Sequence, residues 1–232
     1  MNIIITGASK GLGKAFAKIF AMNENNLFLC ARNIDELNAT ATEIKIVAPQ
    51  ANIYTMQVDL SIKTEVIEFA NWCLSFGTPH ILINNAGNFL SGSIYNEDEN
   101  VLEKMIETNL YSAYYLTRKL LPSMILSKAG HIFNICSIAS LQAYHNGGSY
   151  SISKFAMLGF SKNLREEIKP FNIKVTSVLP GAVYTNSWSE SGVDENRIMK
   201  DIDVAQMVFA ASKLSAQACV EEIVMRPQLG DL

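Results

Sequence analysis

The stretch TGASKGLG, residues 6–13, decides how this chain is expected to fold. It follows the short apolar run Asn2–Thr6, which suits a buried strand, and it opens a helical pattern over Gly11–Met22. Glycines let the backbone turn tightly and approach a ligand, and the free N–H groups at a helix start attract a pyrophosphate. A strand, a glycine-rich turn and a helix in this order predict a dinucleotide-binding unit, although a purely structural turn would have the same glycines.

The alternation of strands and helices continues along the whole chain. The predicted strands are Asn2–Thr6, Asn26–Ala31, Asn52–Gln57, His80–Asn84, Gly130–Cys136, Asn172–Val178 and Cys219–Met225. The predicted helices are Gly11–Met22, Ile34–Val47, Ser61–Ser75, Val101–Leu126, Ser149–Lys169 and Val204–Leu214. Most strands are near-continuous apolar runs, as in parallel sheets that are covered on both faces. We therefore expect a single α/β domain of Rossmann type over residues 1–232, with a doubly wound parallel sheet of about seven strands and helices on both faces. The polar segment 185–200 is expected to be a flexible substrate loop.

Composition narrows the class of protein. With 49% hydrophobic and 18% charged residues, the chain can bury a large core. A net charge of −3 gives no general attraction to nucleic acid or to an anionic membrane, and no apolar run approaches the ~18 residues of a membrane span. The chain runs from Met1 straight into its first strand, and its four cysteines form no pair with metal-ligand or redox spacing. A cytoplasmic protein without a metal is expected.

The second predicted strand indicates which dinucleotide binds. An acid at the end of this strand usually binds the ribose hydroxyls of NAD, but this strand ends in Ala31 and Arg32. Arg32 can contact a 2′-phosphate instead, and Lys10 in the turn adds a second positive charge. NADP(H) is therefore favoured over NAD(H). The alternative is that both side chains are ordinary solvated cations.

The segment YSISK, residues 150–154, opens a long helical pattern. Residues four apart share one helix face, so the Lys154 ammonium can lie beside the Tyr150 phenol. A nearby cation favours the phenolate, and we expect it to lower the pKa of Tyr150 from about 10 toward neutrality. Such a tyrosine can donate a proton to a carbonyl oxygen.

Five motifs together resemble the short-chain dehydrogenase/reductase family over essentially the whole chain. In the family's order they are T-G-x-x-x-G-x-G at 6–13, N-N-A-G at 84–87, Ser137, Y-x-x-x-K at 150–154 and P-G at 180–181. Cys136 stands where many relatives have a second serine, but the catalytic one is retained. The resemblance implies a seven-stranded sheet with NAD(P) lying across the carboxyl ends of its strands.

The resemblance also implies the catalytic residues. These are Asn109, Ser137, Tyr150 and Lys154. Ser137 would bind the substrate oxygen beside Tyr150, Lys154 would also hold the nicotinamide ribose, and Asn109 would support a water-mediated proton path to the lysine. A buried structural amide is the alternative for Asn109.

The residues that the turn, Arg32 and the family motifs assign to the cofactor come from six segments. They are Gly7, Ser9, Lys10, Gly11, Leu12, Gly13, Arg32, Asp59, Leu60, Asn85, Ala86, Gly87, Tyr150, Lys154, Pro180, Gly181, Val183 and Thr185. By the same resemblance, Asp59 would contact the adenine, and the segment 180–185 would wrap around the nicotinamide end.

The substrate is indicated only by the resemblance and by loop residues. Segments 180–188 and 220–231 are similar to bacterial sepiapterin-reductase-like enzymes, which reduce a ketone on a pterin side chain. In those enzymes an aspartate near the C-terminus anchors the pterin, and Asp231 is either its equivalent or a solvated terminal acid. The predicted pocket wall consists of Asn88, Phe89, Leu90, Tyr144, Tyr184 and Trp188. Of these, Phe89, Tyr144, Tyr184 and Trp188 are the candidates for substrate contact, unless they simply cover the core.

Three functions remain open from the sequence. The first is reduction of a ketone or aldehyde carbonyl by NADPH, on a sepiapterin- or diketone-type substrate. The second is a 3-oxoacyl-[acyl-carrier-protein] reductase of fatty-acid synthesis, with Arg118, Lys119 and Lys128 as its basic surface. The third is an NADPH-binding regulatory protein without turnover, which the intact catalytic set disfavours. The resemblance further implies a homodimer or homotetramer that pairs the helices 101–126 and 149–169.

Overall fold

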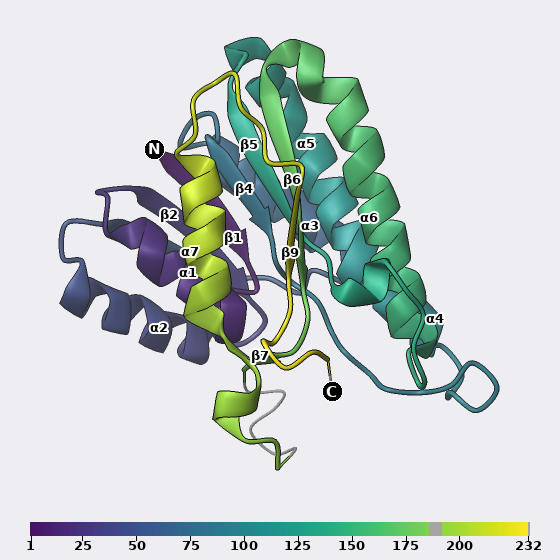
Figure 1. The fold of residues 1–232 in the computed structure, drawn as a ribbon. Coiled ribbons are helices and arrows are strands. Elements are labelled where there is room, and N and C mark those ends of the chain that lie inside the picture. Colours follow the sequence, from purple (N-terminus) through teal and green to yellow (C-terminus); the bar gives the residue numbers. More distant parts are fainter. Residues whose placement is uncertain (186–191, 232) are drawn as a thin grey trace.

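Seven parallel strands form the central sheet of the computed structural model, which describes residues 1–185 and 192–231 (Figure 1). The strands are β1 (Asn2–Thr6), β2 (Asn26–Ala31), β3 (Asn52–Gln57), β4 (Ile81–Asn84), β5 (Gly130–Ile135), β6 (Ile173–Pro180) and β9 (Glu222–Met225). Their order in the sheet is β3-β2-β1-β4-β5-β6-β9. The chain therefore runs outward from β1 to one edge and then crosses to β4 and runs to the other. The predicted doubly wound α/β fold is confirmed, with its switch point between β1 and β4.

Helices cover both faces of this sheet (Figure 1). They are α1 (Gly11–Ala21), α2 (Ile34–Val47), α3 (Lys63–Leu74), α4 (Val101–Ile106), α5 (Ser112–Ser127), α6 (Gly148–Ile168) and α7 (Asp201–Ser212). One face is covered by α1, α2 and α7, and the other by α3, α5 and α6. Because the strands of this sheet are parallel, their carboxyl ends, which carry the motifs, lie at a single edge of the sheet.

Two apolar layers hold these helices to the sheet. Successive side chains of a strand point to opposite faces, and β1 follows this rule. Ile3 and Ile5 pack in the layer that contains Phe16 of α1, whereas Ile4 packs in the layer that contains Phe69 of α3. All five side chains are buried, so β1 is anchored on both faces directly before the glycine-rich turn.

A row of asparagines sets the register of the first three strands. Asn2, Asn26 and Asn52 lie side by side at the starts of β1, β2 and β3. The side-chain Nδ2 of Asn26 donates to Oδ1 of Asn2, and Nδ2 of Asn52 donates to Oδ1 of Asn26, both at 2.9 Å. A shift of one residue would break this row and turn the apolar side chains to the wrong face.

The prediction of one helix over Val101–Leu126 is wrong in one respect. The helix contains a π-helical turn at Glu107–Tyr111, which separates α4 from α5. The turn holds Asn109, whose buried side chain bonds to groups outside its own helix. A π-helical turn has one residue more than an α-helical turn and is common at functional sites. The apolar periodicity of a sequence does not reveal it.

The segment predicted as a loop, 185–200, contains regular structure in part. Val183–Tyr184 (β7) pairs with Met199–Lys200 (β8), and a 3-10 turn at Glu195–Arg197 precedes β8. The side chain of Asp194 accepts a hydrogen bond from Asn196 N–H at the start of that turn. Residues 186–191 lie outside the described residues, and the motion of this segment stays a prediction.

Within residues 1–185 and 192–231, the helices are all too short or too polar to span a bilayer. The same residues contain no cluster of His, Cys, Asp and Glu suited to a metal ion.

Candidate active site

The glycine-rich turn is built from backbone that only glycine allows. Gly7 and Gly11 have φ of +64° and +53°, in the left-handed region that disfavours other residues. Gly13 packs so closely that an added Cβ would lie 2.1 Å from the Gly7 carbonyl oxygen. The glycines therefore let the turn pack tightly at the N-terminus of α1, the kind of helix start at which a pyrophosphate can bind.

The end of β4 is tied directly to this turn. The Asn85 side chain donates from Nδ2 to the carbonyl oxygens of Thr6 at 2.8 Å and Gly7 at 3.1 Å. In return, the Thr6 hydroxyl oxygen accepts the backbone N–H groups of Asn85 and Ala86, at 2.9 and 3.0 Å. The two predicted cofactor-binding motifs therefore form one unit at the switch point of the sheet.

The segment after β6 also reaches the turn. A Cβ on Gly11 would lie 3.2 Å from the Cγ2 atom of Thr185, so the two residues are in close contact. Asp59, at the end of β3, accepts hydrogen bonds from the N–H and hydroxyl of Ser61 through Oδ1. Segments from four parts of the chain thus contribute to one edge, as the motifs predicted.

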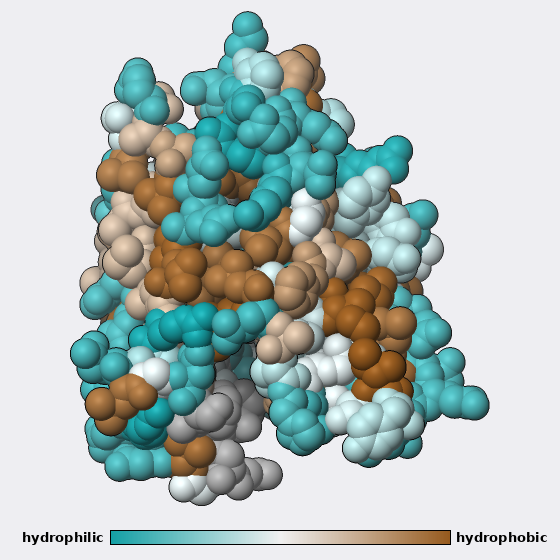
Figure 2. Space-filling model, turned by 45° about the vertical axis from the view of Figure 1, so that its right-hand side comes forward, coloured by the Kyte–Doolittle hydropathy of each residue, from teal (hydrophilic) through white to brown (hydrophobic). Residues whose placement is uncertain are grey.

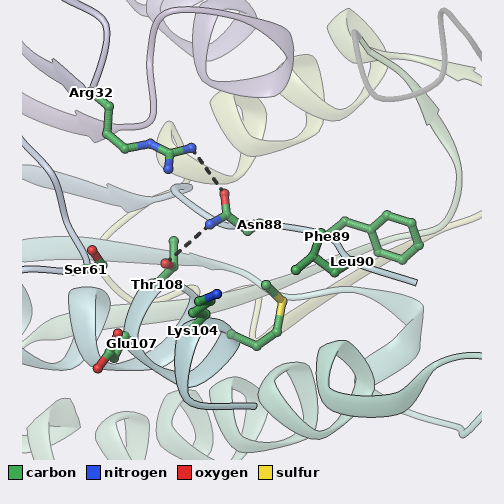
Figure 3. Close-up of a pocket in the computed structure, with 9 residues that line it drawn as sticks. Arg32, Ser61, Asn88, Phe89, Leu90, Lys104, Glu107 and Thr108 are labelled. Carbon is green, nitrogen blue, oxygen red and sulfur yellow. Dashed lines mark hydrogen bonds between the residues drawn. The ribbon is translucent and has the colours of Figure 1, made fainter. Parts of the chain in front are cut away.

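A pocket of about 290 Å³ opens beside Arg32 (Figure 3). Its lining residues are Arg32, Ser61, Asn88, Phe89, Leu90, Lys104, Met105, Glu107 and Thr108. Arg32 donates to Oδ1 of Asn88 at 3.5 Å, and Asn88 donates through Nδ2 to the Thr108 hydroxyl at 3.4 Å. Asn88 and Leu90, predicted on the substrate wall, therefore lie in the pocket of Arg32.

Sequence reasoning missed five of the pocket residues, of which Ser61 follows β3. Lys104, Met105, Glu107 and Thr108 come from α4 and the π-helical turn. Their spacing is that of any amphipathic helix, so only the packing of this helix against the loop after β4 places them here.

Lys154 and Ser137 both lie near Tyr150. The Lys154 side chain is buried, and its Nζ donates to the carbonyl oxygen of Ile135 at 2.9 Å. Nζ lies 5.8 Å from the centroid of the Tyr150 ring. The Ser137 hydroxyl oxygen accepts Ala139 N–H at 3.1 Å and also takes part in a hydrogen bond with Tyr150. The predicted serine, tyrosine and lysine are therefore assembled in one place.

The predicted lowering of the Tyr150 pKa is wrong in this structure. Burial raises the pKa of Tyr150, and the hydrogen bond with Ser137 opposes part of that effect. Burial also lowers the pKa of Lys154. The sequence argument considered the charge of the lysine but not the loss of water around the phenol, which disfavours the phenolate.

Asn109 bridges two segments of this site. Its Oδ1 accepts Asn88 N–H at 2.7 Å, and its Nδ2 donates to the Ser153 hydroxyl at 2.9 Å. A Cβ on Gly87 would lie 3.2 Å from Asn109 Oδ1 and 3.6 Å from Lys154 Nζ. Asn109 therefore has the contacts of a buried structural amide and also lies close to the lysine.

Two aromatic side chains flank Tyr150. The Phe89 ring meets the Tyr150 ring edge-on, with 4.8 Å between centroids, and is 52% exposed. Tyr144 is also largely exposed, and burial of its hydroxyl, followed by the effect of Tyr150, raises its pKa to about 12. Tyr184 lies in β7 and is half-buried. Trp188 falls outside the described residues.

Asp231 is exposed near the C-terminus, but it is not without partners. Its carboxylate pairs with Arg226, and a Cβ on Gly181 would lie 3.1 Å from its Oδ1. Arg197 donates to the carbonyl oxygens of Gly230 at 3.0 Å and Asp231 at 3.3 Å. The C-terminal segment is therefore folded back against the end of β6.

A family model described as short chain dehydrogenase matches residues 1–196. The chain belongs to the short-chain dehydrogenase family. As a short-chain dehydrogenase it is an oxidoreductase, and the predicted family membership is confirmed.

Similar proteins match almost the full length of this short-chain dehydrogenase in sequence or in structure. It is 32% identical to a sepiapterin reductase of Chlorobaculum tepidum, covering 99% of this chain and 97% of that one. A metagenomic short-chain oxidoreductase in complex with NADP is 28% identical, with a TM-score of 0.85 and coverage of 98% and 97%. An alcohol dehydrogenase of Thermococcus sibiricus, complexed with 5-hydroxy-NADP, is 27% identical, with a TM-score of 0.89 and coverage of 98% and 96%.

The residues of this short-chain dehydrogenase fit a dinucleotide. The turn at residues 6–13 places the N-terminus of α1 directly after β1, and the N–H groups of a helix start are suited to phosphate. Arg32 supplies a cation, and Lys154 supplies an ammonium beside Tyr150. The donors are therefore suited to phosphate groups at one end and to ribose hydroxyls at the other.

Proposed function

We propose that this protein reduces a ketone or aldehyde carbonyl to an alcohol, with NADPH as the cofactor and Tyr150 as the proton donor. The observation that carries the proposal is the Tyr150 phenol, which is hydrogen-bonded with Ser137 and lies above the buried Lys154. A phenol and a hydroxyl that converge on one point can both bind a carbonyl oxygen.

The cofactor would be held by the residues that the motifs predicted. The turn residues 6–13 and Asn85–Gly87 would bind the pyrophosphate end, Arg32 and Asp59 the adenosine end, and the segment 180–185 the nicotinamide end. Bound there, NADPH supplies the hydride that reduces the carbonyl carbon. The protein's part is to orient the carbonyl and to deliver a proton.

Ser137 and Tyr150 would perform that part together. Ser137 donates a hydrogen bond to the carbonyl oxygen, and Tyr150 transfers its phenolic proton to the same oxygen as the alcohol forms. Burial raises the pKa of Tyr150, which keeps the phenol protonated before the reaction but also makes it a weaker acid, so the phenolate that forms needs stabilisation. Lys154 then stabilises the phenolate by its charge, and Asn109 supports the return of a proton through water.

Arg32 supports the choice of NADPH over NADH. The end of β2 has no acid to accept the ribose hydroxyls, and Arg32 is exposed there, with its guanidinium hydrogen-bonded to Asn88. Lys10 is exposed in the turn and would add a second charge. Two of the similar structures carry NADP or a derivative of it.

The aromatic pair at Tyr150 supports a planar or apolar substrate. Phe89 and Tyr144 are both exposed beside the phenol, where they can stack on or cover a ligand. The relative named sepiapterin reductase makes a sepiapterin- or diketone-type substrate the first candidate.

Consumption of NADPH with sepiapterin, a small 1,2-diketone and a 3-oxoacyl thioester, measured side by side, tests this proposal. Faster turnover of sepiapterin or the diketone supports it. Faster turnover of the thioester makes the protein a 3-oxoacyl-[acyl-carrier-protein] reductase. NADPH binding without turnover of any carbonyl substrate supports a regulatory protein.

We also propose that the protein forms a homodimer or homotetramer through α4, α5 and α6. Large apolar side chains are exposed on these helices and on the π-helical turn between α4 and α5: Leu102, Tyr111, Tyr114, Ile152 and Phe155. Figure 2 brings the α6 side of the molecule forward and shows apolar patches that reach the surface. Light scattering at micromolar concentration should give a multiple of the 25.6 kDa chain mass. A monomeric mass contradicts this assembly.

A further inference from the structure

The helix that carries Tyr150 starts without a cap of its own. Its N-cap residue is Gly147, which has no side chain to accept an N–H group, and its first turn contains no acid. Gly148, the first helical residue, has φ of +34°. The first N–H groups of a helix need acceptors, and Tyr150 lies in this first turn. By contrast, Asn33 caps α2 from the adjacent position in the chain.

A carboxylate from a distant loop caps this helix instead. Glu97 lies in the loop between β4 and α4, 52 residues before Ser149. Its Oε1 accepts the backbone N–H of Ser149 at 2.9 Å, and its Oε2 accepts the Ser149 hydroxyl. Ser149 is buried, so water cannot easily replace these two bonds. The acceptor is charged and lies at a helix N-terminus, which strengthens the interaction.

Two glycines leave the space for this contact. A Cβ on Gly148 would lie 2.0 Å from Oε1 of Glu97, and a Cβ on Gly92 would lie 2.7 Å from its Cγ. Beside them, the Ser93 hydroxyl donates to Oδ1 of Asn146 at 2.6 Å. The Gly92 N–H donates to the Asn146 carbonyl oxygen at 3.1 Å. The loop is therefore bonded to the segment before the helix as well as to the helix itself.

The same loop touches the catalytic side chain. It begins directly after Asn84, and the ring of its residue Phe89 packs edge-on against Tyr150. Tyr150 directly follows Ser149, so a shift of the first turn moves the phenol relative to Ser137. A displacement of about 1 Å in a catalytic group costs on the order of 10²-fold in rate.

We infer that Glu97 is a positioning residue, which holds the first turn of α6 so that the Tyr150 phenol meets the substrate oxygen. This inference rests on the proposed function of Tyr150. It differs from a role in stability alone, because it requires a loss of kcat in a protein that is still folded and still binds NADPH.

The test compares Glu97→Ala and Glu97→Gln with Glu99→Ala, an exposed acid of the same loop. Glutamine keeps an oxygen for the Ser149 N–H and an amide for the Ser149 hydroxyl, but it has no charge. We expect Glu97→Ala to lower kcat about tenfold or more, with the NADPH dissociation constant within about twofold of the wild type. Glu97→Gln should retain most of kcat, and Glu99→Ala should retain all of it.

Hydrogen exchange of the peptide that contains residues 147–152 is the second readout and needs no turnover. Faster exchange in Glu97→Ala, but not in Glu99→Ala, supports the inference. A wild-type protein that reduces no carbonyl overturns the proposed function. Hydrogen exchange then still tests whether Glu97 holds the first turn of α6. Unchanged exchange in Glu97→Ala, or an active wild type whose Glu97→Ala variant keeps its kcat, overturns the inference.

Discussion

The glycine-rich turn and the start of α6 lie at the same edge of the sheet but are built in different ways. The turn at residues 6–13 is shaped by glycines within eight consecutive positions, two of them in left-handed backbone. The start of α6 has two glycines as well, but its geometry depends on Glu97, 52 residues away from Ser149. The conformation of the turn follows from steric limits on neighbouring residues. The conformation at the start of α6 depends on the folded loop that carries Glu97.

We expect this difference to separate effects on cofactor affinity from effects on kcat. Changes in the turn should act on cofactor affinity, because its backbone forms the cradle. Changes at the start of α6 should act on kcat, because that turn holds Tyr150. Four substitutions test or refine this contrast, in order of decreasing effect.

Tyr150→Phe should lower kcat by at least the ~10²-fold typical of a lost general acid. The NADPH dissociation constant should stay within about twofold, because the ring that packs on Phe89 is kept. Steady-state kinetics and nicotinamide fluorescence measure the two quantities. Tyr95→Phe, at an exposed tyrosine of the same loop as Phe89, is the control and should have no effect. An active Tyr150→Phe protein would falsify the assignment of the proton donor.

Gly13→Ala should weaken NADPH binding about tenfold or more, because its Cβ would lie 2.1 Å from the Gly7 carbonyl oxygen. Overpacking of this kind costs ~1–3 kcal/mol. The matched control is Gly159→Ala, at a glycine of α6 with no atom within 4 Å of the added Cβ. Titration of both variants with NADPH measures the effect. If the two variants bind NADPH equally well, the turn is not a steric cradle.

Arg32→Ala should weaken NADPH about tenfold more than NADH. A hydrogen bond to a charged group contributes ~1.5–3 kcal/mol, and ~1.4 kcal/mol corresponds to tenfold in affinity. Dissociation constants for both cofactors give the ratio, with Arg118→Ala on α5 as the control. Equal losses for NADPH and NADH would mean that Arg32 does not contact the 2′-phosphate.

Asn33→Ala removes the N-cap of α2, whose capping side chain is adjacent in the sequence to the helix that it caps. The Asn33 side chain accepts the N–H groups of Asp35 and Glu36 at 3.0 and 3.1 Å. Its loss should lower the free energy of unfolding by ~1 kcal/mol in urea denaturation. Turnover should stay within about twofold of the wild type, since α2 carries no catalytic residue. A loss of kcat like that expected of Glu97→Ala would break the contrast between the two helix starts.

Much of the fold could be predicted because its signals are local. The strands Asn2–Thr6, Asn26–Ala31 and Asn52–Gln57 have their predicted bounds, since apolar runs of this length bounded by polar residues suit buried strands. The Asn33 cap also lies within four consecutive residues, 33–36. The glycine-rich turn and the Y-x-x-x-K spacing also lie within short stretches.

The features that could not be predicted depend on contacts between distant segments. The π-helical turn at Glu107–Tyr111 places Asn109 against the backbone of Asn88 and the hydroxyl of Ser153. The pKa of Tyr150 follows from its burial, which no spacing reveals. The pairing of Asp231 with Arg226 beside Gly181 depends on how the C-terminal segment folds back.

By itself, the sequence determined the order of strands and helices, the glycine cradle of the turn and the identity of the groups that can do chemistry. Steric limits on the backbone and side-chain periodicity act over a few residues, so a short stretch contains them in full. Only the tertiary structure decided the raised pKa of Tyr150, the partners of Arg32 and Asp231, and the contact of Glu97 with the start of α6. Desolvation and hydrogen bonding depend on which groups the fold brings together, and those groups lie tens of residues apart along the chain.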